Sequence, residues 1–139
     1  MHGFWNLRQT FIERISPRLR EQIGLEVPDV LLLGYIGSST LSPSEIAAQM
    51  RLPPHAISRR LDGLEKRGLI TRRLARGDAR RRVLTLTPAG GGVLETGRAL
   101  LEQHVDQLLA VLDPETRDTM LGALERLATA QPAPKEPPL

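Results

Sequence analysis

Four arginines lie close together in a short polar stretch, where Arg76, Arg80, Arg81 and Arg82 surround a single acidic residue, Asp78. A guanidinium group is permanently charged, and its donors match the oxygens of a phosphate and the edge of a guanine base. Like charges on one loop repel each other unless a polyanion neutralises them. The spacing therefore predicts binding to a polyanion, and an ordinary solvated loop is the alternative.

The net charge of +3 is concentrated in one part of the chain. Residues 59–82 carry ten basic and three acidic side chains, whereas residues 1–58 are neutral and residues 83–139 carry a net charge of −4. Arginine supplies 17 of the 19 basic residues, which suits bidentate contacts to phosphates and bases. Such a local basic patch on an otherwise neutral protein favours a polyanionic partner.

The other residues argue against an enzyme. The absence of cysteine excludes disulfides, thiolate metal sites and thiol-based redox sensing. The three histidines, His2, His55 and His104, lack metal-binding spacing, so neither a metal nor a cofactor is expected. No phosphate-binding glycine motif or nucleophile motif is present. The longest apolar run, residues 30–37, falls well short of the ~20 residues that span a bilayer, and no secretory signal is evident, so a cytoplasmic protein is expected.

Two short helices joined by a tight turn are predicted directly before the arginine-rich loop. The first begins at Ser42, with Pro43 in the first helical position and Glu45 completing a capping box. It ends within residues 51–54, because consecutive prolines cannot continue a helix. The second helix runs over residues 54–67.

This second helix has an apolar face and a polar face. Helical spacing places Ile57, Leu61 and Leu64 inward, and Gly68 is expected to supply a left-handed stop. The outward stripe consists of His55, Ser58, Arg59 and Asp62. Because the N-terminal half of a recognition helix reaches base edges in the major groove, we expect Arg59 to bind a guanine. A solvated helix face is the alternative, and the stripe alone fits it equally well.

A β-hairpin with an arginine-rich tip is predicted after this helix. Residues 84–87 alternate leucine and threonine, Gly77 and Asp78 mark the turn, and Arg72 interrupts the apolar face of the first strand. A helix-turn-helix followed by such a hairpin forms a winged helix-turn-helix. Its wing would lie over the adjacent minor groove, which is narrow, negative and favours inserted arginine.

We expect Arg80 to enter that groove, held by Asp78 through a charge-assisted bond, while Arg76, Arg81 and Arg82 share the phosphates. A simple turn-forming role is the alternative for Asp78.

Apolar stripes predict further helices on both sides of this motif. They cover residues 4–23, 28–37 and 88–112, followed by a last helix capped by Asp113. Pro17 is expected to break or kink the first of these helices near Ser16. The stripes exceed what one small winged helix can cover, which favours a homodimer over a helical bundle within one chain.

The stretch SPSEIAAQM…PPHAISRRLDGLEKRGLITRRLARGDARRRVLTLTPAG, within residues 41–92, resembles the MarR family of winged-helix transcriptional regulators. The most specific pieces are LEKRGLI at 64–70 and the pattern formed by Asp78, Arg80 and the following LTLTPAG. By similarity, residues 54–60 lie in the recognition helix, and Asp78 and Arg80 take the wing-tip positions.

The resemblance implies a mostly α-helical fold with a small β-hairpin. The expected parts are an N-terminal dimerisation helix at 1–26, a winged helix-turn-helix DNA-binding domain at 27–88, C-terminal dimerisation helices at 89–130 and a disordered tail at 131–139. The residues expected to bind DNA are Pro54, His55, Ser58, Arg59, Arg76, Asp78, Arg80, Arg81 and Arg82. Arg60 and Gly63 depart from the family pattern, which usually has an apolar and a larger polar residue there; both bear on how firmly the helix packs.

Family members are homodimers, which implies a pseudo-palindromic double-stranded site. They commonly repress transcription and release DNA when a small, often aromatic acid binds, so an effector is expected here without its identity. Trp5, Tyr35 and His104 are the few aromatic or polar candidates for contacting it, but a core or interface role is favoured for each of them. The alternative function is a winged-helix interaction module whose basic patch binds an acidic partner.

Overall fold

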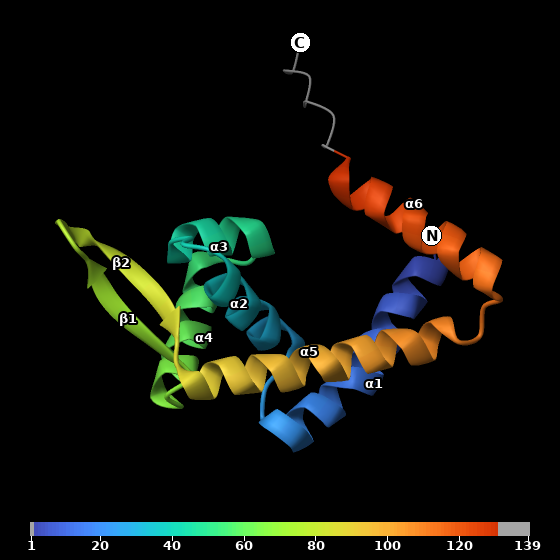
Figure 1. The fold of residues 1–139 in the computed structure, drawn as a ribbon, viewed down its shortest axis with the longest axis horizontal. Coiled ribbons are helices and arrows are strands. Elements are labelled where there is room, and N and C mark those ends of the chain that lie inside the picture. The colour runs from blue at the N-terminus through green and yellow to red at the C-terminus, as the bar shows by residue number, and fades with distance from the viewer. Residues whose placement is uncertain (1, 131–139) are drawn as a thin grey trace, which may run out of the picture. The chain divides into compact units, whose positions relative to one another are not determined.

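The computed structural model describes residues 2–130, apart from the side chains of Phe4, Ala79, Arg80, Arg81 and Ala128. The elements in chain order are α1 His2–Ile23, α2 Val27–Ser38, α3 Pro43–Met50, α4 Pro54–Lys66, β1 Ile70–Ala75, β2 Asp78–Leu86, α5 Pro88–Leu109 and α6 Pro114–Thr129 (Figure 1). The prediction of a mostly helical chain with one small hairpin is confirmed. The tail at 131–139 lies outside the described residues, so its disorder stays a prediction.

The chain divides into two compact units, Met1–Gln103 and His104–Leu139, with the division inside α5. The first unit contains α1 to α4, the hairpin and most of α5, and the second contains the end of α5 and α6. The first unit therefore holds every residue expected to bind DNA.

Local hydrogen bonds explain where two of the helices begin. The Ser42 hydroxyl accepts from the backbone N–H of Glu45 at 3.3 Å, and the Glu45 carboxylate accepts from the backbone N–H of Ser42 at 2.7 Å. This reciprocal pair is the predicted capping box of α3. At α6, the Asp113 carboxylate accepts from the backbone N–H of Thr116 at 3.0 Å and from its hydroxyl at 2.6 Å. The hydroxyl bond first, and the backbone bond second, lower the pKa of Asp113.

Of the break or kink predicted near Ser16, the break is wrong, because α1 continues through Pro17, and the kink stays a prediction. A proline inside a helix removes one backbone hydrogen bond and costs about 3 kcal/mol. The side chains of Ile15 and Leu19 flank the proline and are both fully buried. Burial of two such side chains contributes about 1.5–3 kcal/mol each, which is enough to keep the helix intact.

The hairpin pairs β1 and β2 in antiparallel register, with Ile70 opposite Leu86 and Ala75 opposite Asp78. The turn therefore consists of Arg76 and Gly77, one residue earlier than predicted. Gly77 has a φ of +84°, a left-handed conformation that glycine adopts without steric cost. The pairing register shifts between Leu74 and Ala75, opposite residues 79–81 of β2.

The junction between the hairpin and α5 is tight. A Cβ atom on Gly90 would lie 1.9 Å from the carbonyl oxygen of Leu69, so only glycine fits. The Thr87 hydroxyl donates to the Gly68 carbonyl at 2.6 Å and accepts from the backbone N–H of Gly90 at 3.0 Å. Gly68 has a φ of +70°, which confirms the predicted left-handed stop after α4. Gly90 thereby allows the first turn of α5 to pack against the backbone of Leu69.

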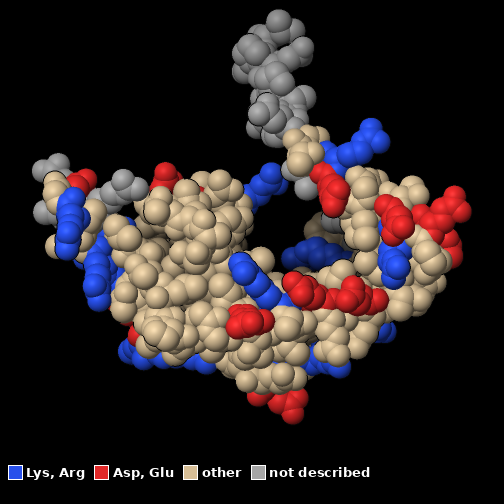
Figure 2. Space-filling view, in the orientation of Figure 1, with Lys and Arg blue, Asp and Glu red and all other residues tan. Residues whose placement is uncertain are grey.

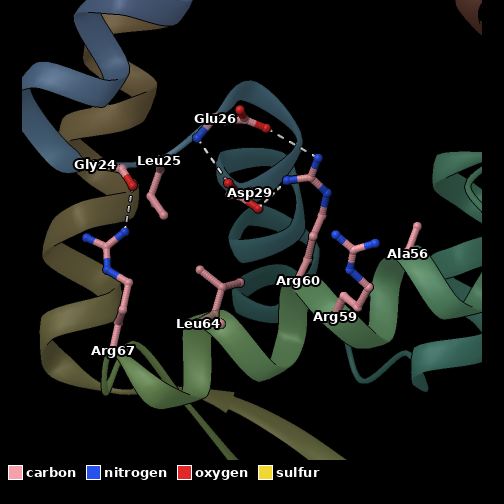
Figure 3. A pocket seen from close by; sticks show the side chains of 10 residues that line it. Gly24, Leu25, Glu26, Asp29, Ala56, Arg59, Arg60, Leu64 and Arg67 are labelled. Carbon is pink, nitrogen blue, oxygen red and sulfur yellow. Dashed lines mark hydrogen bonds and ion pairs between the residues drawn. The ribbon is translucent and has the colours of Figure 1, made fainter.

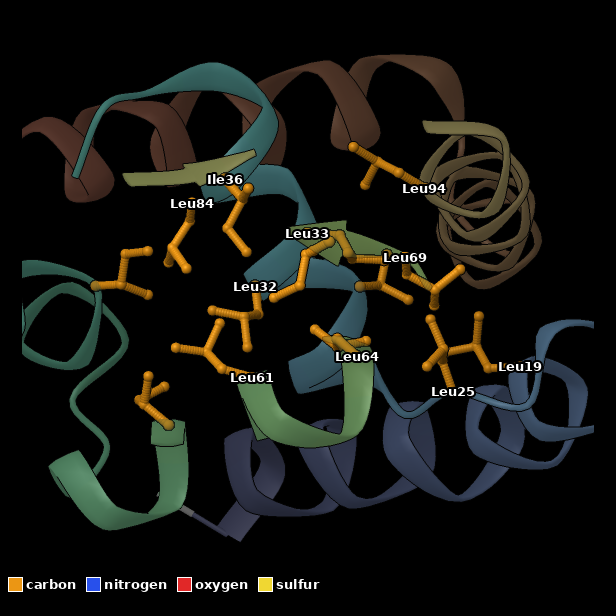
Figure 4. Close-up of a cluster of buried hydrophobic side chains, with 14 of the residues drawn as sticks. Leu19, Leu25, Leu32, Leu33, Ile36, Leu61, Leu64, Leu69, Leu84 and Leu94 are labelled. Carbon is orange, nitrogen blue, oxygen red and sulfur yellow. The ribbon is translucent and has the colours of Figure 1, made fainter. Parts of the chain in front are cut away.

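One hydrophobic core joins the helices of the first unit to the hairpin. In Figure 4, Leu32 and Leu33 of α2 point toward Leu61 and Leu64 of α4. The predicted inward face of the second helix is confirmed, because Ile57, Leu61 and Leu64 are all at most 2% exposed. The core thereby holds α4 by one side only and leaves its opposite side to solvent.

Apolar side chains remain exposed in each unit. In α1, Trp5 is 60% and Leu7 is 56% exposed, and in the second unit Leu124 is 52% and Leu127 is 72% exposed. Tyr35 packs against the core and His104 is buried. None of the described helices is long and apolar enough to cross a membrane.

Candidate nucleic-acid interface

The outward face of α4 carries the polar side chains that the sequence predicts. Pro54, His55, Ser58 and Arg59 are all exposed. Because the buried leucines fix the opposite side of the helix, these side chains project into solvent from its N-terminal half. No ion pair or hydrogen bond joins the Arg59 side chain to another described residue, so its donors remain available to a ligand.

Asp62 extends this stripe in the sequence but has a different role in the structure. Its carboxylate accepts from Nη2 of Arg72 on β1, and Nε of Arg72 lies 3.2 Å from a carboxylate oxygen of Glu65. The Arg72 side chain is only 17% exposed. Arg72 therefore ties the hairpin to the C-terminal half of α4, which explains an arginine on the inner face of β1.

The hairpin carries a group of exposed charges. Arg73, Arg76, Asp78 and Arg82 are exposed, and Figure 2 shows basic side chains gathered along the hairpin at the left of the view. The side chains of Arg80 and Arg81 lie outside the described part, so their positions and the Asp78–Arg80 bond stay predictions. The backbone of both arginines belongs to β2, where the pairing register shifts.

Two further arginines, Arg60 of α4 and Arg67 directly after it, turn toward the corner where α1 ends and α2 begins (Figure 3). Arg60 donates from Nη1 to the Asp29 carboxylate at 2.7 Å, and its Nη2 lies 3.4 Å from the Glu26 carboxylate. Arg67 donates from Nη1 to the Gly24 carbonyl at 2.7 Å and from Nη2 to the Ile23 carbonyl at 2.8 Å. We call these two arginines with their four acceptors the corner clamp.

The corner clamp explains why an arginine, Arg60, stands where the family usually has an apolar residue. Burial lowers the pKa of Arg60, but hydrogen bonds and charges from Asp29 and then Glu26 outweigh it, so the pKa lies above its ordinary value. Arg60 therefore anchors α4 where an apolar side chain would pack. Sequence reasoning missed this partner, although Glu26 and Asp29 are the acidic residues directly before and within the first turn of the apolar helix α2.

A hollow of about 530 Å³ lies between α4 and this corner. It is lined by Gly24, Leu25, Glu26, Asp29, Ala56, Arg59, Arg60, Gly63, Leu64 and Arg67. Gly63 has no neighbour within 4 Å of its Cβ position, which keeps the hollow open beside Arg59. The hollow combines guanidinium groups with an apolar floor. Among the described residues, no group of His, Cys, Asp and Glu could hold a metal ion.

Comparisons with known proteins show which family the chain belongs to. The model of the MarR family matches residues 23–81, which include α4 and most of the hairpin. The HTH-type transcriptional regulator BilQ of Clostridium symbiosum is 30% identical over 100 residues, which cover 71% of this chain and 69% of BilQ.

Solved structures share the fold over nearly the whole chain. The MepR–DNA complex of Staphylococcus aureus aligns with a TM-score of 0.77 and 21% identity, covering 94% of this chain and 96% of MepR. The Mycobacterium tuberculosis MarR family protein Rv2887, in complex with p-aminosalicylic acid, aligns with a TM-score of 0.77 and 22% identity, covering 92% of this chain and 97% of Rv2887. The shared fold, the family match and the similarity to BilQ agree, and the chain therefore belongs to the MarR family of DNA-binding transcriptional regulators.

Proposed function

We propose that this regulator is a ligand-responsive repressor that binds a pseudo-palindromic operator as a homodimer. In this proposal, the N-terminal half of α4 enters the major groove and the hairpin reaches the adjacent minor groove and phosphates. Each protomer supplies one helix and one hairpin, so a two-fold dimer meets two half-sites about one helical turn, ~10–10.5 bp, or a multiple of it apart.

The observation that carries the proposal is that some charged side chains in and directly after α4 bind groups of the protein, whereas Arg59 does not. Arg60 and Arg67 are held by the corner, and Asp62 and Glu65 are held by Arg72. Arg59 is left without a described partner on the solvent-facing side, beside the exposed Ser58 and His55. A charged group that the fold does not use is available for recognition.

The homodimer is supported by the exposed apolar side chains of both units. Trp5 and Leu7 in the first unit, and Leu124 and Leu127 in the second, are each more than half exposed. Exposed apolar patches of this kind mark association surfaces. We propose that a second copy of the chain covers them.

The ligand response is supported by the relative Rv2887, whose solved complexes contain p-aminosalicylic acid and salicylic acid. In this chain, the hollow beside α4 offers the Arg59 guanidinium to a carboxylate and Leu64 and Ala56 to an aromatic ring. We propose a small aromatic acid as the effector class. Salicylate added to the operator complex should then release the DNA in a fluorescence anisotropy titration.

The DNA-binding proposal is tested by the salt dependence of binding to a random duplex. A protein that neutralises several phosphates should lose affinity by about 10³-fold or more between 50 and 200 mM salt, because bound counterions are released. A flat response would favour the alternative, a basic patch that binds an acidic protein. Selecting bound fragments from genomic DNA would then give the operator.

A further inference from the structure

Arg59 and Arg60 are neighbours on α4 but differ in what they contact. Arg59 has no described partner, whereas its neighbour Arg60 is bound to two carboxylates of the α1–α2 corner. Both side chains belong to the basic segment from which DNA contacts would be expected. The structure separates them, because the Arg60 side chain is 28% exposed and the side chain of its partner Asp29 is 13% exposed.

We propose that Arg60 positions the recognition helix for DNA by holding α4 on the first turn of α2, through Asp29 and Glu26, without contacting DNA itself. The inference rests on the proposed function, since positioning matters only if α4 reads DNA. It assigns to Arg60 and Asp29 a part in specificity that the outward face of the helix does not reveal.

The apolar stripe of α4 does not by itself fix the rotation of the helix about its axis. Ile57, Leu61 and Leu64 lie along a single side, and such contacts are non-directional. Arg60 lies at the edge of this stripe and adds a directional contact, because the N–H donors of a planar guanidinium group reach a carboxylate in only a narrow range of geometries. Its bonds to Asp29 and Glu26 therefore resist a rotation that the leucines alone would permit.

The carboxylate of Asp29 is already oriented by a local hydrogen bond before it binds Arg60. One carboxylate oxygen accepts from the backbone N–H of Glu26 at 3.0 Å, and the other accepts from Arg60. The first contact belongs to the start of α2 itself, so the acceptor is oriented locally before the two helices meet. A preorganised acceptor loses little freedom when the second bond forms, which makes it a rigid support.

Arg67 gives the helix a second point of attachment. It lies seven residues after Arg60, on the same side of the helix, and binds the carbonyls of Ile23 and Gly24 at the end of α1 instead of a carboxylate. In Figure 3, Arg60 and Arg67 reach the corner on either side of Leu64. Two supports flanking an apolar contact hold both the rotation and the tilt of a helix, so α4 moves with the α1–α2 corner.

The experiment is a double-mutant cycle on DNA recognition. Arg60→Met keeps most of the length of the side chain and removes the guanidinium group. Asp29→Asn keeps an acceptor for the Glu26 N–H and removes the negative charge. We expect each single variant to lower affinity for a selected operator by about tenfold, and the double variant to be no weaker than either single one. Fluorescence anisotropy measures the affinities, and circular dichroism confirms that each variant is folded.

Two further readouts separate positioning from a phosphate contact. Affinity for a random duplex, and its dependence on salt, should stay unchanged in Arg60→Met, because loss of one phosphate contact would reduce the salt slope by ~0.9. Arg59→Met is the matched control, since it removes the neighbouring arginine that has no described partner. Its effect on operator affinity should add to that of Asp29→Asn.

An unchanged operator-to-random affinity ratio in Arg60→Met, additive effects in the cycle, or a reduced salt slope would overturn the inference. If Arg60→Met does not fold, Arg60→Lys makes the same comparison. Lysine keeps the positive charge but lacks the planar guanidinium group, so a smaller loss of specificity is expected. A wild-type protein that binds no duplex at 50 mM salt would instead overturn the proposed function. The two failures are therefore distinguishable.

Discussion

At the scale of single residues, the fold divides one basic segment into two groups with different roles. Arg60, Arg67 and Arg72 bind groups of the protein, whereas Arg59 and Arg76 are exposed. Arg60, Arg67 and Arg72 are fixed by partners from other elements, so they hold α4 and the hairpin in place. The exposed ones carry the charge that a DNA backbone can neutralise.

Replacing Arg59 should weaken and broaden recognition of the operator. Arg59→Ala is expected to cost about 1–3 kcal/mol of binding free energy and to relax the preference at one base pair, because a bidentate contact to guanine is lost. Affinity measured on operators with single base changes tests this. The exposed arginine of α5, Arg98, gives a matched control, and equal losses for Arg98→Ala would argue for a general charge effect.

Replacing Arg80 tests the minor-groove contact proposed for the hairpin. Arg80→Ala should cost about 1–3 kcal/mol of operator binding and leave dimerisation intact, since it removes a charge from a narrow, negative groove. Anisotropy titration and sedimentation measure the two properties on the same sample. Operator affinity equal to that of the wild type would remove Arg80 from the mechanism.

At the scale of the elements, two local features decide how the hairpin and the short helices are placed. Gly90 allows the first turn of α5 to lie against the backbone of Leu69, which sets the exit of the hairpin. The capping box of Ser42 and Glu45 starts α3, whose packing supports α4. Both features act through the backbone, so replacing a single side chain with alanine should change the free energy of unfolding.

A methyl group at Gly90 should destabilise the fold. Gly90→Ala is expected to cost at least about 1–3 kcal/mol of unfolding free energy, because its Cβ would collide with the backbone of Leu69. Gly92→Ala is the matched control, since nothing lies within 4 Å of its Cβ position, and alanine there should stabilise the helix by about 0.4–1 kcal/mol. Urea unfolding of both variants measures the difference, and equal stability would contradict the close approach.

Removing the cap of α3 should have a smaller effect. Ser42→Ala is expected to lower the unfolding free energy by about 0.5–2 kcal/mol, because the backbone N–H of Glu45 loses its acceptor. Ser44→Ala provides the comparison, since Ser44 is exposed within the same helix. A drop in Tm for Ser44→Ala as large as for Ser42→Ala would show that the cap contributes nothing.

At the scale of the whole molecule, we propose that a second copy of the chain covers the exposed apolar side chains of both units. Trp5, Leu7, Leu124 and Leu127 would otherwise remain in water. Two chains that cover these side chains would also present two recognition helices to one duplex. Self-association and operator symmetry are thus linked in this proposal.

The chain should therefore sediment at twice its 15.4 kDa mass at micromolar concentration. Leu124→Glu combined with Leu127→Glu should shift the equilibrium toward the monomer, because burying these carboxylates in an apolar interface is unfavourable. A wild-type protein that sediments as a monomer would defeat the homodimer proposal.

Much of the fold follows from local patterns in the sequence. The capping box at Ser42, the apolar stripe of α4 and the glycine stop at Gly68 are each confirmed, since periodicity and capping involve residues only a few positions apart. The continuous helix through Pro17 and the turn at Arg76–Gly77 differ from prediction. In the first case, burial on both sides of the proline outweighs its local cost, which the local pattern does not reveal.

The sequence by itself determined the order of the elements, the family and the basic character of the recognition segment. Only the tertiary structure decided which charge serves the fold and which faces solvent. Arg60 meets Asp29 across 31 positions of sequence, and Arg67 meets the Gly24 carbonyl across 43. The physical reason is that a guanidinium group carries the same charge wherever it stands, and its role is set by the acceptors that packing brings within reach.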